Sequence, residues 1–251
     1  RIKMRFAITI EYDGSNLVGW QRQTNGLSVQ EVLEKALFEL TGEKKTIQGS
    51  GRTDAGVHAL GQVAHFDLKK TMTMDAIRDG LNFHIKKLYK KIKVSVLATK
   101  KVKKDFHARF SAKKKTYVYK ILDRRPPPAI KKKRVWHVRK KLDDKAMKEA
   151  AKILVGRHDF TSFRSTECQA KSPLKTIDSI KILRIGEEIQ IWIKARSFLH
   201  NQVRIIVGTL VLVGRKKWEE KNIGEALKSK KRAAAGQTAP AEGLYLHSVK
   251  Y

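Results

Sequence analysis

Apolar and polar side chains alternate along six stretches of the chain, most of them with the period of two that is typical of a β-strand with one covered face. These stretches are residues 4–11, 63–68, 92–98, 116–122, 177–185 and 188–195. Sheets with one covered and one polar face are usually antiparallel. The pattern therefore predicts a mostly antiparallel sheet.

Helices are expected between these strands, where apolar residues recur three or four positions apart. Ser28 and Glu31 have the spacing of a capping box, the apolar positions that follow continue to residue 40, and Gly42 can end the helix. The same periodicity predicts helices over residues 74–81, 143–155, 198–213 and 223–229.

Both halves of the chain contain strands with helices beside them, so we predict an α/β fold of the α+β type. We interpret the basic segment 99–104 as a joint, which divides the chain into residues 1–105 and 106–251. Between residues 124 and 134, three prolines and a run of cations predict an exposed loop, because proline cannot continue a strand ladder and like charges repel.

The charge of the chain narrows the classes of partner that it is expected to bind. Lys and Arg total 55 against 24 Asp and Glu, a formal net charge of +31, which favours RNA or DNA over a membrane surface. Cys168 is the only cysteine, so an internal disulfide and a zinc site built from cysteines are excluded. No apolar run is long enough to span a bilayer. We expect a soluble protein of the reducing cytoplasm.

The most unusual local segment surrounds Asp54. It reads GSGRTDAGVHA over residues 49–59, and its three glycines let the backbone bend sharply. The spacing matches neither glycine-rich template for binding a nucleotide phosphate, so we expect no nucleotide cofactor. By itself, an aspartate in such a loop most often caps a turn.

This segment closely resembles the active-site motif of the tRNA pseudouridine synthase A family. Six further segments resemble motifs of that family in the same order: EYDGSNLVGWQRQ at 11–23, DFHARFSA at 105–112, KTYVYKI at 115–121, HDFTSF at 158–163, FLHNQVRIIVGTL at 198–210 and GQTAPAEGLYL at 236–246. The resemblance implies a pseudouridine synthase fold, in which two similar halves with mainly antiparallel sheets, flanked by helices, form a basic cleft with Asp54 at its floor.

The resemblance also implies an activity. Asp54 is expected to attack a uridine at C6 of the base or C1′ of the sugar, after which the freed uracil turns and rejoins through C5. Bond breaking and remaking balance in this isomerisation, so no metal and no cofactor are expected. Family members act as homodimers on the anticodon stem-loop of tRNA, at positions 38 to 40.

Three further residues receive roles by resemblance. Arg204 is expected to pair with Asp54 and keep its carboxylate ionised, Tyr117 to pack against the target base, and Arg52 to assist base flipping. Without the motifs, each would be interpreted as an ordinary surface or core residue. The family's usual arginine beside the tyrosine is replaced here by Lys115 and Thr116.

Two segments resemble RNA-contacting stretches of the family. The first comprises Phe106, His107, Ala108, Arg109 and Phe110, which combine cations that can bind phosphate with rings that can stack on bases. The second is CQAKSP at 168–173, with Gln169 and Lys171 as its candidate contacts. The chain departs most from the family over residues 81–92, where members commonly contain a proline.

Two alternatives remain open at this stage. A non-catalytic RNA-binding or ribosome-associated protein would explain the charge and the aromatic residues, but it leaves Asp54 unexplained. An RNA methyltransferase or another nucleotide-dependent enzyme would require a cofactor loop, which the sequence does not show.

Overall fold

The computed structural model describes residues 3–251, which form two compact units. The first unit comprises Arg1–Lys113 together with Tyr245–Tyr251, and the second comprises Lys114–Leu244. The expected division at residue 105 differs from these units in where it places residues 106–113 and 245–251. The second unit is thus an insertion between two parts of the first.

Strands of the first unit are β1 (Met4–Tyr12), β2 (Gln48–Gly49), β3 (His58–Leu68), β4 (Val94–Val102) and β10 (Leu244–Lys250). Strand β1 lies between β3 and β4 and pairs antiparallel with both, while β3 also pairs with β2 antiparallel and with β10 in parallel. Alternate residues of β1, among them Phe6, Ile8 and Ile10, are buried. Each such side chain contributes about 1.5–3 kcal/mol of transfer free energy.

The prediction of a joint over residues 99–104 is wrong, because residues 99–102 continue β4. Ile8 of β1 is opposite Thr99, and Phe6 is opposite Lys101. Strand β4 lies at the edge of the sheet, where lysines are common because they discourage pairing with a further strand.

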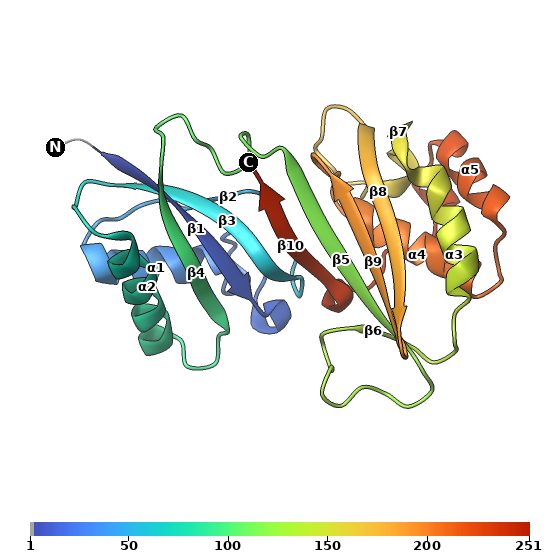
Figure 1. Cartoon of the computed structure of the whole chain (residues 1–251), viewed down its shortest axis with the longest axis horizontal. Coiled ribbons are helices and arrows are strands. Elements are labelled where there is room, and N and C mark those ends of the chain that lie inside the picture. Colours follow the sequence, from blue (N-terminus) through green and yellow to red (C-terminus); the bar gives the residue numbers. More distant parts are fainter. Residues whose placement is uncertain (1–2) are drawn as a thin grey trace. The chain divides into compact units, whose positions relative to one another are not determined.

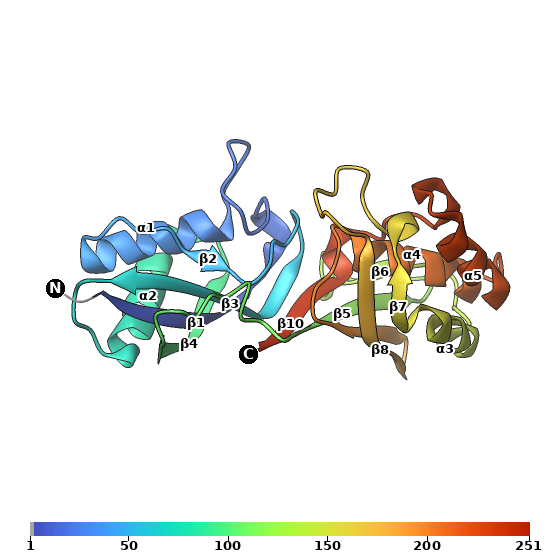
Figure 2. The same cartoon turned by 90° about the horizontal axis from the view of Figure 1, so that it is seen from above.

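Two helices of the first unit, α1 (Val29–Thr41) and α2 (Met74–Leu88), pack against each other, and α2 also packs on β4 (Figures 1 and 2). The limits of α1 are confirmed: Ser28 accepts a hydrogen bond from the Glu31 N–H, and Gly42 ends the helix in the left-handed region at φ 73°. Helix α2 continues seven residues beyond the predicted end at Leu81, since no proline interrupts residues 82–88.

The second unit has five strands: β5 (Lys114–Asp123), β6 (Trp136–Val138), β7 (Gly156–Asp159), β8 (Leu174–Ile185) and β9 (Glu188–Ala195). Strands β5, β9, β8 and β7 are neighbours in that order and antiparallel, and β6 pairs in parallel with β5. The mainly antiparallel α+β fold predicted from the sequence is confirmed in both units.

Helices α3 (Asp144–Ala151), α4 (Gln202–Gly214) and α5 (Glu220–Ser229) gather on the side of the unit where β7 and β8 lie (Figure 1). Two predictions need correction. Helix α4 begins at Gln202 rather than Phe198, after Asn201 at φ 63°, and the predicted helix over 143–155 ends as the 3-10 turn Lys152–Leu154. The other 3-10 turns are Gly14–Asn16, Thr161–Phe163, Arg232–Ala234 and Ala241–Gly243.

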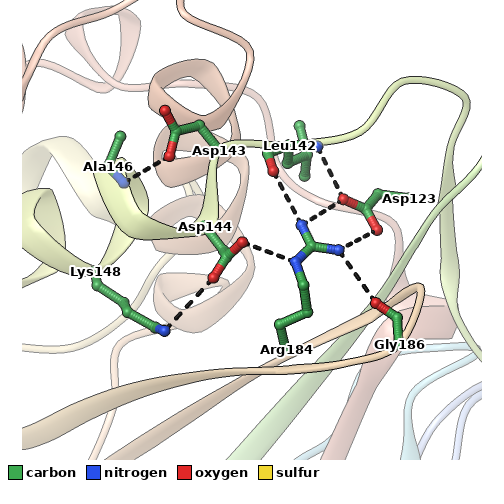
Figure 3. Close-up of polar contacts among 8 residues, drawn as sticks. All are labelled: Asp123, Leu142, Asp143, Asp144, Ala146, Lys148, Arg184 and Gly186. Atoms are coloured by element: carbon green, nitrogen blue, oxygen red, sulfur yellow. Dashed lines mark hydrogen bonds and ion pairs between the residues drawn. The ribbon is translucent and has the colours of Figure 1, made fainter.

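Arg184 joins three elements of the second unit (Figure 3). Its guanidinium, on β8, donates to both carboxylate oxygens of Asp123 on β5, at 2.8 and 2.9 Å, and to Asp144 of α3 at 2.7 Å. It also donates to the Leu142 carbonyl at 3.0 Å. The Asp123 side chain is fully buried, so Arg184 compensates an anion that has no access to water.

Candidate active site

The Asp54 loop connects β2 to β3 and is held by the segment that follows β1. Asp54 forms an isolated antiparallel bridge with Gly19, and the Trp20 N–H donates to the Thr53 carbonyl at 3.0 Å. Two segments that resemble family motifs, 11–23 and 49–59, therefore meet through their backbones. Backbone hydrogen bonds on both sides of Asp54 limit the positions that its carboxylate can take.

Gly19 has to be a glycine for this contact to form. Its φ is +101°, and a Cβ at this position would lie 2.3 Å from the Thr53 carbonyl oxygen. Any larger residue would push the loop away. No local pattern in the sequence singles out Gly19 for this role, because the residue it contacts lies in a separate segment.

A buried hydrogen bond anchors the residue before Asp54. The Tyr12 phenol at the end of β1 lies 2.7 Å from the Thr53 hydroxyl, and both side chains are buried. Burial raises the pKa of Tyr12 to about 12, against which its hydrogen bonds with Thr53 and Gln62 act in part. The phenol thus keeps its proton at neutral pH.

A second buried network holds the start of the loop. The Ser50 hydroxyl donates to Gln62 Oε1 at 2.6 Å, and Gln62 Nε2 donates to the Gly51 carbonyl at 2.9 Å. Ser50 and Gln62 are both fully buried. The polar groups that form these bonds have partners, so the network stiffens the loop at residues 50–51, ahead of Asp54 in the sequence.

His58 serves the packing of the loop. Its Nδ1 accepts a hydrogen bond from the Gly14 N–H at 3.0 Å, and its ring lies 4.7 Å from that of Tyr245 on β10. A Cβ on Gly14 would approach the Val57 carbonyl oxygen to 2.1 Å. The backbone after Asp54 is thereby fixed as closely as the backbone before it.

The candidate side chains of this loop face solvent to different degrees. Arg52 is exposed and Asp54 is half-buried, while Thr53 between them is buried. A half-buried carboxylate on a rigid backbone is accessible to a substrate and has already lost much of its freedom to move. The loop can therefore present a nucleophile without a large conformational change.

Arg204 lies in the first turn of α4, in the second unit. Its Nε donates to the Ala239 carbonyl at 2.8 Å, and its own carbonyl accepts from the Ala239 N–H at 3.0 Å. The segment 236–243 thus sets the direction of the guanidinium. Both segments resemble family motifs in sequence, but no sequence pattern indicates that they are in contact.

Helix α4 and the segment 236–239 approach so closely that glycine is required. A Cβ on Gly208 would lie 1.8 Å from the Gln237 carbonyl oxygen, and the Gly236 N–H donates to the Thr209 hydroxyl at 2.9 Å. Arg232 also donates to the Gly236 carbonyl at 2.8 Å. These contacts fix the Ala239 carbonyl on which Arg204 depends.

Tyr117 and Tyr119 share one face of β5 in the second unit. Tyr117 is 9% exposed, with its ring edge-on to Phe198 at a centroid distance of 5.2 Å. Tyr119 is fully buried and donates to the Pro240 carbonyl at 2.6 Å, and burial raises its pKa well above the usual value. Of the two rings, only Tyr117 retains exposed surface.

The residues of the two candidate RNA-contacting segments differ in exposure. Arg109 and Phe110 are exposed in the first unit, Phe106 and His107 are half-buried, and Ala108 is buried, so Ala108 offers no side chain to a ligand. Gln169 and Lys171 are exposed, in the loop between the turn Thr161–Phe163 and β8 of the second unit.

Neither a metal-binding cluster nor a membrane-spanning helix is found among residues 3–251. That range contains no group of three or more His, Cys, Asp or Glu side chains placed to hold a metal ion. None of its helices is both long and apolar enough to cross a bilayer.

Known proteins resemble this chain over nearly its whole length. The family model described as tRNA pseudouridine synthase matches residues 8–111 and 150–251. The tRNA pseudouridine synthase A of Rhodospirillum centenum is 52% identical over 247 residues, covering 98% of this chain and 99% of the relative. The protein of that name from Maricaulis maris is 50% identical and covers 98% of each chain.

The mainly antiparallel α+β fold agrees with these matches. The chain belongs to the tRNA pseudouridine synthase family, whose members are isomerases. The resemblance inferred from the sequence motifs is thereby confirmed.

Proposed function

We propose that this protein converts uridine to pseudouridine in the anticodon stem-loop of tRNA, at positions 38 to 40, with Asp54 as the nucleophile. The observation that carries the proposal is the rigid backbone around Asp54, in a chain about 50% identical to proteins named tRNA pseudouridine synthase A. Such a loop positions a nucleophile in advance, which lowers the entropic part of the barrier.

The reaction needs only groups that the chain itself supplies. The Asp54 carboxylate attacks C6 of the base or C1′ of the sugar, and the glycosidic bond breaks with its electron pair going to the uracil. The uracil turns, C5 bonds to C1′ and the bond to Asp54 breaks. The hydrogen on C5 leaves as a proton, and N1, which has lost its bond to the sugar, takes up a proton. Atoms and electrons balance, so no oxidant or reductant is required.

We propose supporting roles for Arg204, Tyr117 and Arg52. A fixed guanidinium favours the ionised form of a carboxylate, and Ala239 and Asn201 restrain the guanidinium of Arg204. Tyr117 supplies an aromatic surface for the base, and stacking on such a ring is worth about 1–3 kcal/mol. Arg52 is exposed two residues before Asp54, where it can meet the RNA backbone.

The proposed partner is tRNA, bound by a homodimer in the cytoplasm. A net charge of +31 supports a polyanionic partner, and Phe106, His107, Arg109, Phe110, Gln169 and Lys171 are the proposed contacts outside the site. The competing proposal is a non-catalytic RNA-binding protein, in which Asp54 would have no chemical role.

Release of tritium from tRNA tests the two proposals. A fully unmodified tRNA labelled with tritium at C5 of uridine should lose the label with the wild type, since the new bond forms at that carbon. Asp54→Ala and Asp54→Asn should release none while still binding tRNA. Absence of release by the wild type would contradict the enzymatic proposal and favour the RNA-binding one.

A further inference from the structure

The turn at residues 106–110 rests on a fixed floor in the first unit. The Ala108 N–H donates to His65 Nδ1 on β3 at 3.0 Å, and the Tyr251 hydroxyl donates to the Ala108 carbonyl at 2.7 Å. Arg5 of β1 donates to the Phe106 carbonyl at 2.7 Å. Three well-separated parts of the sequence thus fix the inner side of this turn.

His107 holds the outer side of this turn in place. Its Nδ1 accepts hydrogen bonds from the Arg109 N–H at 3.1 Å and the Phe110 N–H at 3.3 Å. A nitrogen that accepts cannot carry the proton, so the proton of the neutral ring lies on Nε2, which is 2.7 Å from Gln48 Oε1. Gln48 belongs to β2, which leads directly into the Asp54 loop.

Phe110 and Arg109 form the exposed end of this arrangement, which we name the Phe110 platform. The Phe110 ring lies 4.4 Å from the His107 ring, and the Arg109 guanidinium lies 5.5 Å from the Phe110 centroid. Phe110 is nevertheless 71% exposed. A large apolar ring held in water by a hydrogen-bonded turn, beside a cation, has the makeup of a surface on which a nucleobase stacks.

We infer that His107 is a positioning residue that holds the Phe110 platform as a stacking site for one unpaired nucleobase of RNA. The inference rests on the proposed function only for the identity of the RNA. Exposed cations at Lys103, Lys104 and Lys113 flank the platform in sequence and suit the adjoining phosphates.

Protonation of His107 should open the platform, because an imidazolium has no acceptor for the two N–H groups. The titratable and charged groups that face it are His65 on β3, Arg5 on β1 and Arg109 on its own turn. Burial, Arg5 and Arg109 lower the pKa of His107, so the neutral ring persists at physiological pH. If His107 instead bound a phosphate as a cation, its protonation would strengthen RNA binding in acid.

Binding of an unmodified tRNA transcript to the full-length protein tests the stacking site. Phe110→Ala should weaken binding about 5- to 160-fold, which is the ~1–3 kcal/mol of one stacked base, without changing the dependence on salt. Phe110→Trp keeps an aromatic ring and should retain affinity for the transcript, whereas Phe110→Leu has no aromatic ring and should bind more weakly. Arg109→Ala should lower the salt slope by about one. Equal binding by Phe110→Leu and wild type would overturn the inference.

His107 variants test the positioning role. His107→Asn keeps an acceptor near the place of Nδ1 and should preserve affinity, while His107→Ala should match Phe110→Ala. Below pH about 6.5, wild-type affinity should fall relative to His107→Asn. Identical pH profiles, or weak binding by His107→Asn with unchanged melting temperature, would contradict the role.

Failure of this inference is distinguishable from failure of the proposed function. Wild-type protein that releases tritium, while Phe110→Leu binds tRNA as tightly as the wild type, would contradict the stacking site alone. Wild-type protein that releases no tritium, but binds tRNA with the variant pattern above, would contradict the enzyme proposal alone.

Discussion

The Tyr12 phenol and the Thr53 hydroxyl meet at 2.7 Å in the interior of the first unit, one residue away from Asp54. This pair ties the end of β1 to the loop that carries the proposed nucleophile. Thr53 also accepts from the Trp20 N–H through its carbonyl, so one residue is held by its side chain and its backbone together. The position of Asp54 thus depends on groups that never touch a substrate.

Tyr12→Phe should slow catalysis more than it weakens tRNA binding. Removing the phenol leaves the buried Thr53 hydroxyl without this partner, which should lower the free energy of unfolding by about 1–3 kcal/mol. Single-turnover tritium release should slow while the tRNA dissociation constant stays within about twofold. Tyr89→Phe, at the end of α2, is the matched control and should leave the rate unchanged. An unaltered rate in Tyr12→Phe would show that the pair is structural only.

Gly19→Ala should displace the Asp54 loop. The new Cβ would lie 2.3 Å from the Thr53 carbonyl oxygen at φ +101°, so the backbone has to move. We expect tritium release to fall at least tenfold, a loss of about 1.4 kcal/mol of transition-state stabilisation. Gly42→Ala is the control, because its φ is +73° but nothing lies within 4 Å, and it should cost about 1–2 kcal/mol of stability without slowing the reaction.

Arg184→Ala should destabilise the second unit strongly. The variant leaves the fully buried Asp123 carboxylate without its cation, for which about 3–5 kcal/mol is expected in urea denaturation. Arg124→Ala is the control: Arg124 pairs with the largely exposed Glu187, and such surface pairs contribute about 0–1 kcal/mol. Equal losses in the two variants would contradict the importance of the buried carboxylate.

Acid should destabilise the protein through His65. Burial first, and then the charges of His107 and Arg5, lower the pKa of His65 to about 4, against about 6.5 in an unfolded chain. The contribution of the neutral His65 ring to the free energy of unfolding is therefore fully present above pH 6.5 and is lost as the pH falls towards 4. His65→Asn keeps an acceptor for the Ala108 N–H and does not titrate. Its free energy of unfolding should decline less than that of the wild type between pH 6.5 and 4.

Sequence patterns succeeded where the signal was local. The limits of α1 follow from Ser28 and Gly42, which act within the helix itself. Strand β10 was not predicted, because its pairing with β3 joins residues far apart in the chain. Strand β4 was predicted too short, since its lysines were interpreted as solvated charge although an edge strand tolerates them.

The candidate site was accessible from sequence only through resemblance. Asp54 in a glycine-rich loop has, on physical grounds, the pattern of an ordinary turn. The contacts that fix it, from Gly19 and Tyr12, and the contact of Arg204 with Ala239 depend on distances between separate segments. No local periodicity carries that information.

Strand β10 determines the order in which parts of the chain can fold during synthesis. Residues 245–251 leave the ribosome only after the whole second unit, yet they lie beside β3, with Tyr245 against the His58 ring just after the Asp54 loop. A nascent chain can thus fold most of its first unit early but has to leave the place of β10 vacant. The proposed catalytic loop acquires its last support only after the second unit has been synthesised, so a chain that ends within that unit has no finished site with which to act on RNA.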